Sequence, residues 1–309
     1  MESPSSCPLC GGPLRATGVR SIDRLVTDDG PFAISECPSC RYGVTLPQMS
    51  DEELERYYGS GYYACYYGHG GEGPHGLLEH ARELFRRRAG ARRANRPPFA
   101  ADARPAGRVL DVGCGSGELL SHYREHGWET FGIDPSEQAA ALARERGASV
   151  HRGTLADQPW PVESFDLIVF SHSLEHIPQP VQALRLARGL LADGGRLAIA
   201  VPNWRCWQRH VFGGRWAHLD LPRHLQHFSP RSLTVIAGVL DLEVVELGTS
   251  STVIAVAYSL HYVIAGRWTP GWKLWLAYAL GAAVFPAVAV VNRLLGADCA
   301  YAVLRRPEI

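Results

Sequence analysis

A glycine-rich loop between a buried strand and a helix is the feature that most constrains how this chain folds. Residues 109–120 read Val-Leu-Asp-Val-Gly-Cys-Gly-Ser-Gly-Glu-Leu-Leu, so an apolar strand enters three glycines at alternate positions and an apolar helix start follows. Glycine lets the backbone turn and approach a ligand closely, and the helix N-terminus offers unpaired N–H groups. The pattern predicts a cofactor loop at Gly113, Gly115 and Gly117; the alternative is a plain strand-to-helix turn.

A carboxylate after the next strand indicates what this loop holds. The strand expected at residues 129–133 ends at Asp134, at about the 20-residue spacing at which an acid meets the two hydroxyls of a ribose. The glycines are spaced G-x-G-x-G, whereas the dinucleotide fingerprint is G-x-G-x-x-G, and Asp111 lies inside the strand end. These features favour a nucleoside ligand without a pyrophosphate.

Three motifs carry a resemblance to a known family. D-V-G-C-G-S-G with G-I-D-P, S-F-D-L-I-V-F-S-H-S-L-E-H-I-P-Q-P and L-A-D-G-G-R-L-A-I-A-V-P-N resemble the class I methyltransferases that use S-adenosylmethionine, over about residues 105–250. The resemblance implies that Asp134 binds the ribose, that Asp111 and the loop amides surround the methionine part, and that Ser171 faces the sulfonium. The cofactor contacts expected in full are Asp111, Gly113, Cys114, Gly115, Gly117, Asp134, Pro135, Leu155 and Ser171.

The chain departs from the family pattern near the adenine. It has Thr154 where many relatives place an acid. Leu155 is therefore expected to give an apolar contact, and Asp157 is the candidate substitute for the acid.

Strands and helices alternate through the central part of the chain. The segments expected are residues 108–112, 119–126, 129–133, 137–145, 149–151, 166–171, 181–191 and 196–201. Alternation indicates a parallel sheet with helices on both faces, with ligands bound at the carboxyl ends of the strands. With the resemblance, this predicts an α/β, Rossmann-like, mostly parallel seven-stranded sheet with an antiparallel last strand.

The composition supports a folded chain and disfavours nucleic acid as a partner. Hydrophobic residues make up 46% of the 309 residues, enough for a sizeable core. Lys plus Arg equals Asp plus Glu at 31 each, so the whole molecule has no electrostatic attraction for nucleic acid. Residues 1–6 lack the regions of a signal peptide, and we expect a cytoplasmic, reducing setting.

Four of the eight cysteines form two C-x-x-C pairs. Cys7 with Cys10, and Cys37 with Cys40, offer the four soft ligands of a closed, structural Zn²⁺ site. A module of about 40 residues needs such a staple because its own core is small. We predict a zinc ribbon; the alternative is four unmetallated thiols.

These features divide the chain into three parts. We expect a zinc-ribbon module at residues 1–48, lid or linker helices at 49–104 and a methyltransferase domain at 105–309, with an apolar helical insertion at 250–297. In the resembling enzymes a segment before the core folds over the cofactor as a lid. Its tyrosines, which include Tyr57, Tyr58 and Tyr62, either touch the ligand or pack at a domain seam. A basic helix at 77–94 is either a solvated face or a contact for anions.

The acceptor site is expected after the fourth and fifth strands of the core. Glu175 and His176 are candidate catalytic residues, and they also occur as a pair in similar quinone and small-molecule O-methyltransferases; the alternative is that they cap a turn. His218 and His224 are candidate bases because a hydroxyl acceptor loses its proton as it attacks. The expected substrate contacts are His172, Trp204 and Arg223, with Arg223 as an anion anchor.

The apolar insertion is long enough to meet a membrane. Residues 274–291 carry no charge, and Trp268, Trp272 and Trp275 precede or begin the run. Both flanking strands are expected in one sheet, so a single crossing is excluded. We predict a re-entrant or interface-lying helical pair with 253–265, broken near Pro286; the alternative is a protein-packed cap or a dimer interface.

The sequence therefore predicts an S-adenosylmethionine-dependent methyltransferase with a structural zinc ion, peripheral to the inner face of the membrane. O-methylation of a lipid-linked, glycan or other amphipathic small-molecule acceptor is the first hypothesis. The alternatives are a ribosomal RNA base methyltransferase, which the zero net charge disfavours, and a non-catalytic adaptor on a methyltransferase scaffold. The acceptor, the attacking atom and the oligomeric state stay open.

Overall fold

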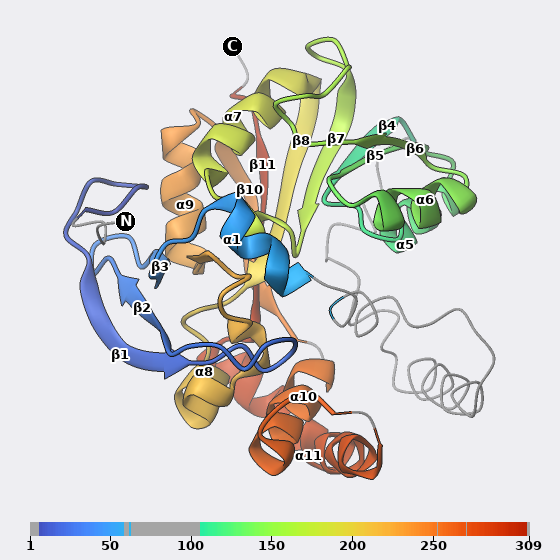
Figure 1. Ribbon diagram of the computed structural model, residues 1–309. Helices are drawn as coiled ribbons and strands as arrows, with labels where there is room; N and C mark the ends of the chain where they lie inside the picture. The colour runs from blue at the N-terminus through green and yellow to red at the C-terminus, as the bar shows by residue number, and fades with distance from the viewer. Residues whose placement is uncertain (1–5, 59–61, 63–105, 252, 270, 308–309) are drawn as a thin grey trace.

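Two β-sheets organise the computed structural model, which describes residues 6–58, 62, 106–251, 253–269 and 271–307 (Figure 1). The larger sheet has the strand order β10-β11-β8-β7-β4-β5-β6. Its strands are β4 (Arg108–Val112), β5 (Glu129–Asp134), β6 (Ser149–Arg152), β7 (Phe165–Ser171), β8 (Leu191–Pro202), β10 (Glu243–Ser250) and β11 (Cys299–Arg305). Strands β4 to β8 are parallel, whereas β11 runs antiparallel to β8 and β10. The predicted Rossmann-like sheet is confirmed.

Apolar side chains cover both faces of this sheet. Leu167 and Val169 of β7 belong to one core, and Ile168 and Phe170 belong to the other, because successive side chains of a strand point to opposite faces. The helices that complete the two cores are α5 (Glu118–Glu125) and α6 (Glu137–Glu145) on the first, and α7 (Pro180–Leu190) and α9 (Pro230–Val239) on the second. The sheet is thus a rigid base for the loops at its carboxyl edge.

The smaller sheet joins the N-terminal segment to a loop of the catalytic core. Its order is β1 (Arg15–Ser21), β2 (Phe32–Glu36), β3 (Gly43–Leu46) and β9 (Gln226–His227). β9 lies in the long segment between β8 and α9, and Gly43 pairs with His227. The cysteine-bearing segment is therefore fixed against the part of the chain that carries the predicted acceptor residues. The short helix α1 (Asp51–Glu55) follows β3, with Ser50 and Glu53 forming a capping box.

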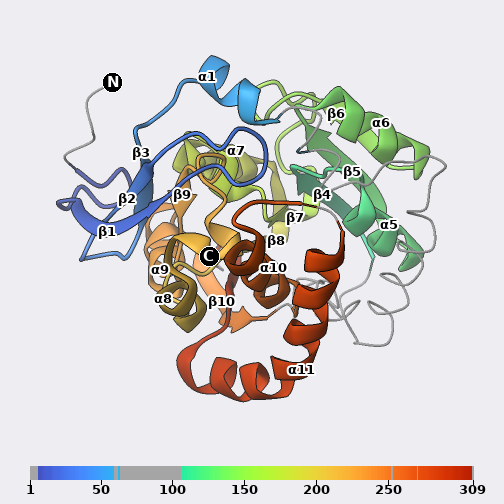
Figure 2. The same ribbon diagram turned by 60° about the horizontal axis from the view of Figure 1, so that its bottom comes forward.

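The apolar helical insertion is confirmed between the last two strands. α10 (Val253–Ala265) and α11 (Trp272–Leu295) connect β10 to β11. β10 and β8 are both antiparallel to β11, so β10 runs parallel to β8 and delivers α10 to the carboxyl edge of the sheet. Figures 1 and 2 show α8 (Trp207–Phe212), α10 and α11 gathered at this end.

The break predicted near Pro286 is wrong, because α11 is one continuous helix through this residue. Proline removes one backbone hydrogen bond, and packing on both sides of it keeps the helix intact. Gly281 lies against α10, where an added Cβ would come within 3.1 Å of the Ala257 Cβ. Val288 and Asn292 are buried on the other side of the proline.

Candidate active site

The glycine loop between β4 and α5 requires glycine at three positions. Gly113, Gly115 and Gly117 have φ values of 75°, 51° and 76°, in the left-handed region that other residues rarely adopt. A Cβ on Gly113 would lie 2.5 Å from the Cβ of Ser173, and one on Gly117 would lie 2.8 Å from the Cβ of Ala143. The predicted loop is therefore closely packed on its neighbours, with the helix N-terminus behind it.

Two buried acids flank this loop. Asp134 is 8% exposed, and its carboxylate accepts hydrogen bonds of 2.9 Å from the N–H groups of Gly115 and Ser136. Asp111 is 3% exposed, and its Oδ1 has no hydrogen-bond partner among the described residues. Burial, together with the charge of Asp134, raises the pKa of Asp111 to about 7. These acids fit S-adenosylmethionine, whose ribose hydroxyls and ammonium group are hydrogen-bond donors.

The other predicted cofactor residues lie around the loop in different ways. The Cys114 side chain is buried in the core beside Gly132, so it has only backbone groups to offer a ligand. Leu155 is buried as well, Pro135 is exposed beside Asp134, and Ser171 is half-buried at the end of β7. Their contacts with the cofactor stay predictions.

The structure brings together the predicted acceptor residues from two separate segments. His172 has a φ of 53°, an uncommon left-handed conformation, and its Nδ1 lies 3.5 Å from Oε1 of Glu175. The ring of His218 stacks on that of His172 at a centroid distance of 5.9 Å. The ring of His224 meets that of His176 edge-on at 4.6 Å. His172, His176 and His224 thus lie around the buried carboxyl group of Glu175, and His218 joins this cluster through the ring of His172.

Glu175 is the charged centre of this histidine cluster. It is 1% exposed, and neither carboxylate oxygen makes a hydrogen bond to a described residue. Burial works to raise its pKa, but His172 and His224 outweigh burial and lower the pKa of Glu175 to about 2. The group is therefore a carboxylate at neutral pH.

His224 presents an unprotonated nitrogen to this carboxylate. Burial, reinforced by His176, lowers the pKa of His224 to about 4. Its Nδ1 donates to the carbonyl oxygen of His218 at 2.9 Å, so the neutral ring leaves Nε2 as an acceptor, 3.9 Å from Glu175. Two acceptors that face each other accommodate a hydroxyl donor or a cation, and ligand-capable atoms of Glu175, His176 and His224 lie within 4.8 Å of one another.

Asp298 is a site residue that the sequence analysis missed. It is fully buried at the start of the last strand, and its Oδ2 lies 3.2 Å from Nε2 of His218. Its Oδ1 accepts from Ser251 at 2.6 Å and from Gln208 at 3.2 Å. Asp298 therefore ties the two ends of the apolar insertion to His218. Its position in the sequence carries no motif that would have identified it.

Two predicted substrate contacts need correction. Arg223 is fully buried and pairs with Asp23 at 2.8 Å and Asp220 at 2.6 Å, so its charge is already neutralised and it does not act as an anion anchor. Trp204 is 1% exposed, and its indole N–H donates to Glu36 at 2.7 Å. Both side chains are thus used to join the N-terminal segment to the core, and neither is free to bind a substrate.

Part of the predicted lid is described by the structure. Tyr57 is buried against Phe32, which places it at the seam between segments. The Tyr58 hydroxyl lies 3.0 Å from Nδ1 of His176 and so borders the acceptor side. Residues 63–105, which include the other lid tyrosines and the predicted basic helix, lie outside the described residues.

Replacement of Asp111 by Asn is expected to change how stability depends on pH. Asp111 has a pKa of about 7 in the folded chain and an ordinary value of 3.8. Between these two values the folded chain keeps this proton while the unfolded chain has lost it, so the free energy of unfolding falls as pH rises from about 4 to 7. We expect Asp111→Asn to gain about 2 kcal/mol relative to wild type between pH 5 and pH 8, measured by urea unfolding without cofactor. Asp193→Asn, at an exposed position, is the control. If the free energy of unfolding of Asp111→Asn differs from that of wild type by the same amount at pH 5 and pH 8, the raised pKa of Asp111 is refuted.

Comparison with known proteins agrees with this geometry. A family model described as "Methyltransferase domain" matches residues 80–247, more than half of the chain. A ubiquinone biosynthesis O-methyltransferase of Nitrosospira multiformis is 31% identical over 189 residues, which cover 53% of this chain and 78% of the relative. The protein of the same name from Idiomarina loihiensis is 30% identical over 153 residues, covering 44% of this chain and 61% of that protein.

A third relative of that name, from Rhodopseudomonas palustris, is 27% identical over 149 residues, covering 46% of this chain and 59% of its own length. The chain thus spans about three fifths of the length of the Idiomarina and Rhodopseudomonas relatives. Among solved structures, a Haloferax volcanii methyltransferase in complex with the Trm112 methyltransferase activator superimposes with a TM-score of 0.50 at 19% identity, over 74% of this chain and 96% of that one. This likeness shows the fold alone. The chain belongs to the methyltransferase-domain family and has the fold of the class I S-adenosylmethionine-dependent methyltransferases.

Proposed function

We propose that this enzyme methylates a hydroxyl oxygen of an amphipathic small-molecule acceptor at a membrane surface. The observation that carries the proposal is the position of the exposed apolar helix α11 at the carboxyl edge of the sheet, where the acceptor must also bind. An acceptor with an apolar part would then reach the site without leaving the membrane interface.

The histidine cluster suits a hydroxyl acceptor. Bound S-adenosylmethionine supplies an electrophilic methyl carbon, and the enzyme must hold the acceptor oxygen in line behind it. A hydroxyl needs its proton removed as it attacks, and His218 and His224 each have an unprotonated nitrogen when neutral. Three relatives are named as O-methyltransferases of ubiquinone biosynthesis, which also favours oxygen as the attacking atom.

The apolar surface of α11 has the form of an interfacial helix. Among the described residues, α11 is the one helix that is long and apolar enough to cross a membrane. Only 17% of its apolar 18-residue window is buried in the protein. Trp272 is 70% exposed, and Leu276, Leu280 and Val284 follow at intervals of four residues with about two fifths of each exposed. They form one apolar stripe, since residues four apart lie on one side of a helix.

The connections of the insertion favour a peripheral contact. β10 and β11 are paired neighbours, with Ser250 opposite Cys299, so the chain enters and leaves the insertion at one sheet edge. A single crossing would separate these strands by the thickness of a membrane. We therefore place the helices flat on, or dipping into, the cytoplasmic face of the membrane, with Trp272 and Lys273 at the start of α11 in the interface.

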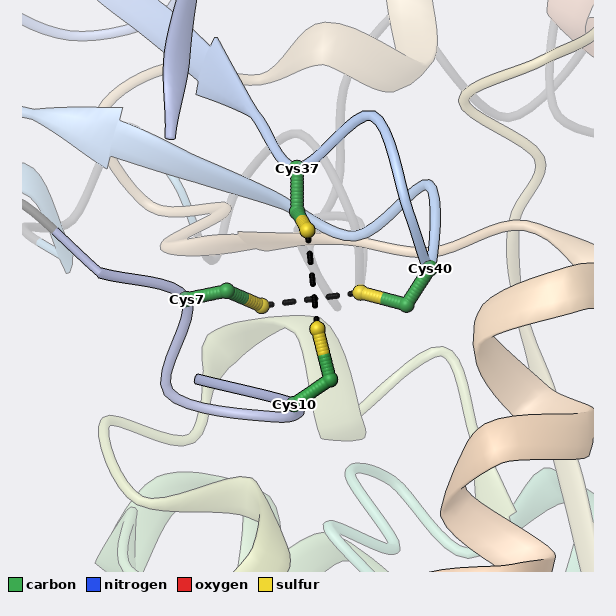
Figure 3. Close-up of side chains that lie close together, drawn as sticks. All are labelled: Cys7, Cys10, Cys37 and Cys40. Atoms are coloured by element: carbon green, nitrogen blue, oxygen red, sulfur yellow. Dashed lines mark hydrogen bonds between the residues drawn. The ribbon is translucent and has the colours of Figure 1, made fainter. Parts of the chain in front are cut away.

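We further propose that a structural zinc ion holds the N-terminal segment. The four sulfur atoms of Cys7, Cys10, Cys37 and Cys40 point to a common centre (Figure 3), with Cys7–Cys40 and Cys10–Cys37 distances of 3.5 Å. Tetrahedral coordination at Zn–S distances of ~2.3 Å places sulfurs about 3.8 Å apart, close to this arrangement. Burial favours a neutral Cys37, but backbone and thiol hydrogen bonds from Cys40 and Cys10 outweigh it and lower the pKa of Cys37 to about 7.

Metal analysis tests the zinc proposal. We expect the purified protein to contain one zinc ion per chain, and Cys37→Ser to lose it and to unfold roughly 10 °C lower, because the segment has little core of its own. Cys206→Ser, a buried free cysteine outside the cluster, should keep its zinc. Zinc-free wild-type protein, or equal zinc in wild type and Cys37→Ser, would refute the site.

Methyl transfer to matched acceptors tests the proposed function. We expect higher kcat/KM for a long-chain alkyl catechol in vesicles than for catechol in solution. The double variant Trp272→Glu with Leu280→Glu should lose vesicle binding by more than tenfold, because burial of each such side chain is worth about 1.5–3 kcal/mol. It should lose the preference for the alkyl catechol as well.

Val162→Glu is the matched control, since Val162 is 74% exposed and lies outside the insertion. Affinity for S-adenosylhomocysteine should be the same in all three proteins, which shows that each is folded. Equal use of both catechols by wild type, or methylation of ribosomal RNA alone, would contradict the proposal.

A further inference from the structure

A cleft of about 360 Å³ lies between the N-terminal sheet and α8, away from the histidine cluster. β1, β2 and α8 lie side by side in both views (Figures 1 and 2). The charged and titratable side chains that line it are Arg15, Glu36, Arg41, Arg205, Arg209 and His210. Four guanidinium groups therefore face one carboxylate.

Glu36 does not neutralise this cleft. One of its carboxylate oxygens pairs with Arg41 at 3.0 Å, while the other accepts from the Trp204 indole at 2.7 Å and lies 3.5 Å from Arg205. Within the described ranges, Arg15 and Arg209 form no ion pair. Positive charge is thus in excess, although the whole chain has a formal net charge of zero.

Arg209 is the buried cation of the cleft. It is 8% exposed, and its Nε is buried without a hydrogen-bond partner among the described residues. Its guanidinium lies 4.2 Å from the ring centroid of Trp204, which fixes its plane. Burial, followed by the repulsion of Arg205, lowers the pKa of Arg209, and burial with Arg209 nearby lowers that of His210. Nη2 of Arg209 lies 2.9 Å from Nε2 of His210, so Arg209 would act on an anion in the cleft chiefly through its charge.

We propose that this cleft is a binding site for a phosphate-bearing group, separate from the methyl-transfer site. Guanidinium groups bind phosphate through paired N–H donors, and the cleft has the volume of a small-molecule site. Several arginines match the charge of a phosphate or diphosphate better than that of a single carboxylate. The Trp204 ring, against which Arg209 lies, is 5.2 Å from the ring of His227 in β9.

The cleft is joined to the apolar insertion through α8. Arg209 and His210 of α8 face the cleft, while the Trp207 indole on the same helix donates to Asn292 of α11 at 2.7 Å. A phosphate next to an apolar chain is the chemistry of a phospholipid headgroup and of a phosphorylated amphipathic acceptor. The link to the acceptor rests on the proposed function, whereas the anion site does not depend on it.

Calorimetric titration of the full chain with inorganic pyrophosphate tests the site. We expect binding by wild type and roughly tenfold weaker binding by Arg205→Gln and by Arg15→Gln, because each loses charge-assisted hydrogen bonds. Arg144→Gln is the matched control and should bind as wild type. Arg205 and Arg144 are 40% and 41% exposed in their side chains, and each pairs with one glutamate, at 3.5 and 3.2 Å.

Two further arms distinguish the source of the phosphate. If pyrophosphate displaces wild type, but not Arg205→Gln, from phosphatidylglycerol vesicles, the ligand of the cleft is a lipid headgroup. If pyrophosphate binds but leaves vesicle binding unchanged, the ligand is a soluble phosphate compound. Both outcomes support the site. Each variant should bind S-adenosylhomocysteine with the same affinity as wild type. A loss of pyrophosphate binding alone then concerns the cleft, whereas a loss of S-adenosylhomocysteine binding concerns the methyltransferase site.

The proposal is overturned if wild type binds no pyrophosphate at millimolar concentration, or if Arg205→Gln and Arg144→Gln bind it equally. It is also overturned if an RNA oligonucleotide binds more tightly than pyrophosphate with a steep salt dependence, because that result indicates a row of phosphates along a nucleic acid.

Discussion

The hydrogen bond from the Gly115 N–H to the Asp134 carboxylate is the contact on which the cofactor site depends. It joins the loop after β4 to the end of β5, and it requires the left-handed backbone that the three glycines supply. The loop in turn sits on Ser173, which begins the segment that carries Glu175 and His176. Cofactor and acceptor residues are thus positioned by one glycine turn, and a side chain at Gly113 would push them apart.

The long segment between β8 and α9 links the remaining parts of the molecule. It contributes β9 to the N-terminal sheet, Arg223 to a buried ion cluster with Asp23, and His218 and His224 to the acceptor side. An uncompensated buried charge is strongly destabilising, so these contacts are expected to fix the segment. The cysteine-bearing module therefore has a structural part in shaping the acceptor side.

Much of this fold could be predicted from short-range patterns. Alternating strands and helices, three glycines and an acid at the expected spacing are local signals, and the parallel sheet and the loop geometry follow from them. Arg223 and Trp204 were misinterpreted because their partners Asp23 and Glu36 are about 170 to 200 residues away, and a hydrogen bond across that separation leaves no local pattern. Asp298 was missed for the same reason. The helix break predicted at Pro286 was wrong because the tertiary packing on both sides of this residue leaves no signal in the sequence.

Three features meet at the carboxyl edge of the sheet: acids that suit a nucleoside, a carboxylate surrounded by histidines, and the exposed apolar helix α11. The central claim is that this edge binds S-adenosylmethionine, and titration with S-adenosylhomocysteine in a calorimeter tests it most directly. The account predicts micromolar binding by wild type and at least tenfold weaker binding by Asp134→Ala, with circular dichroism showing that the variant is still folded. Failure of wild type to bind, or equal affinity in Asp134→Ala, would contradict it.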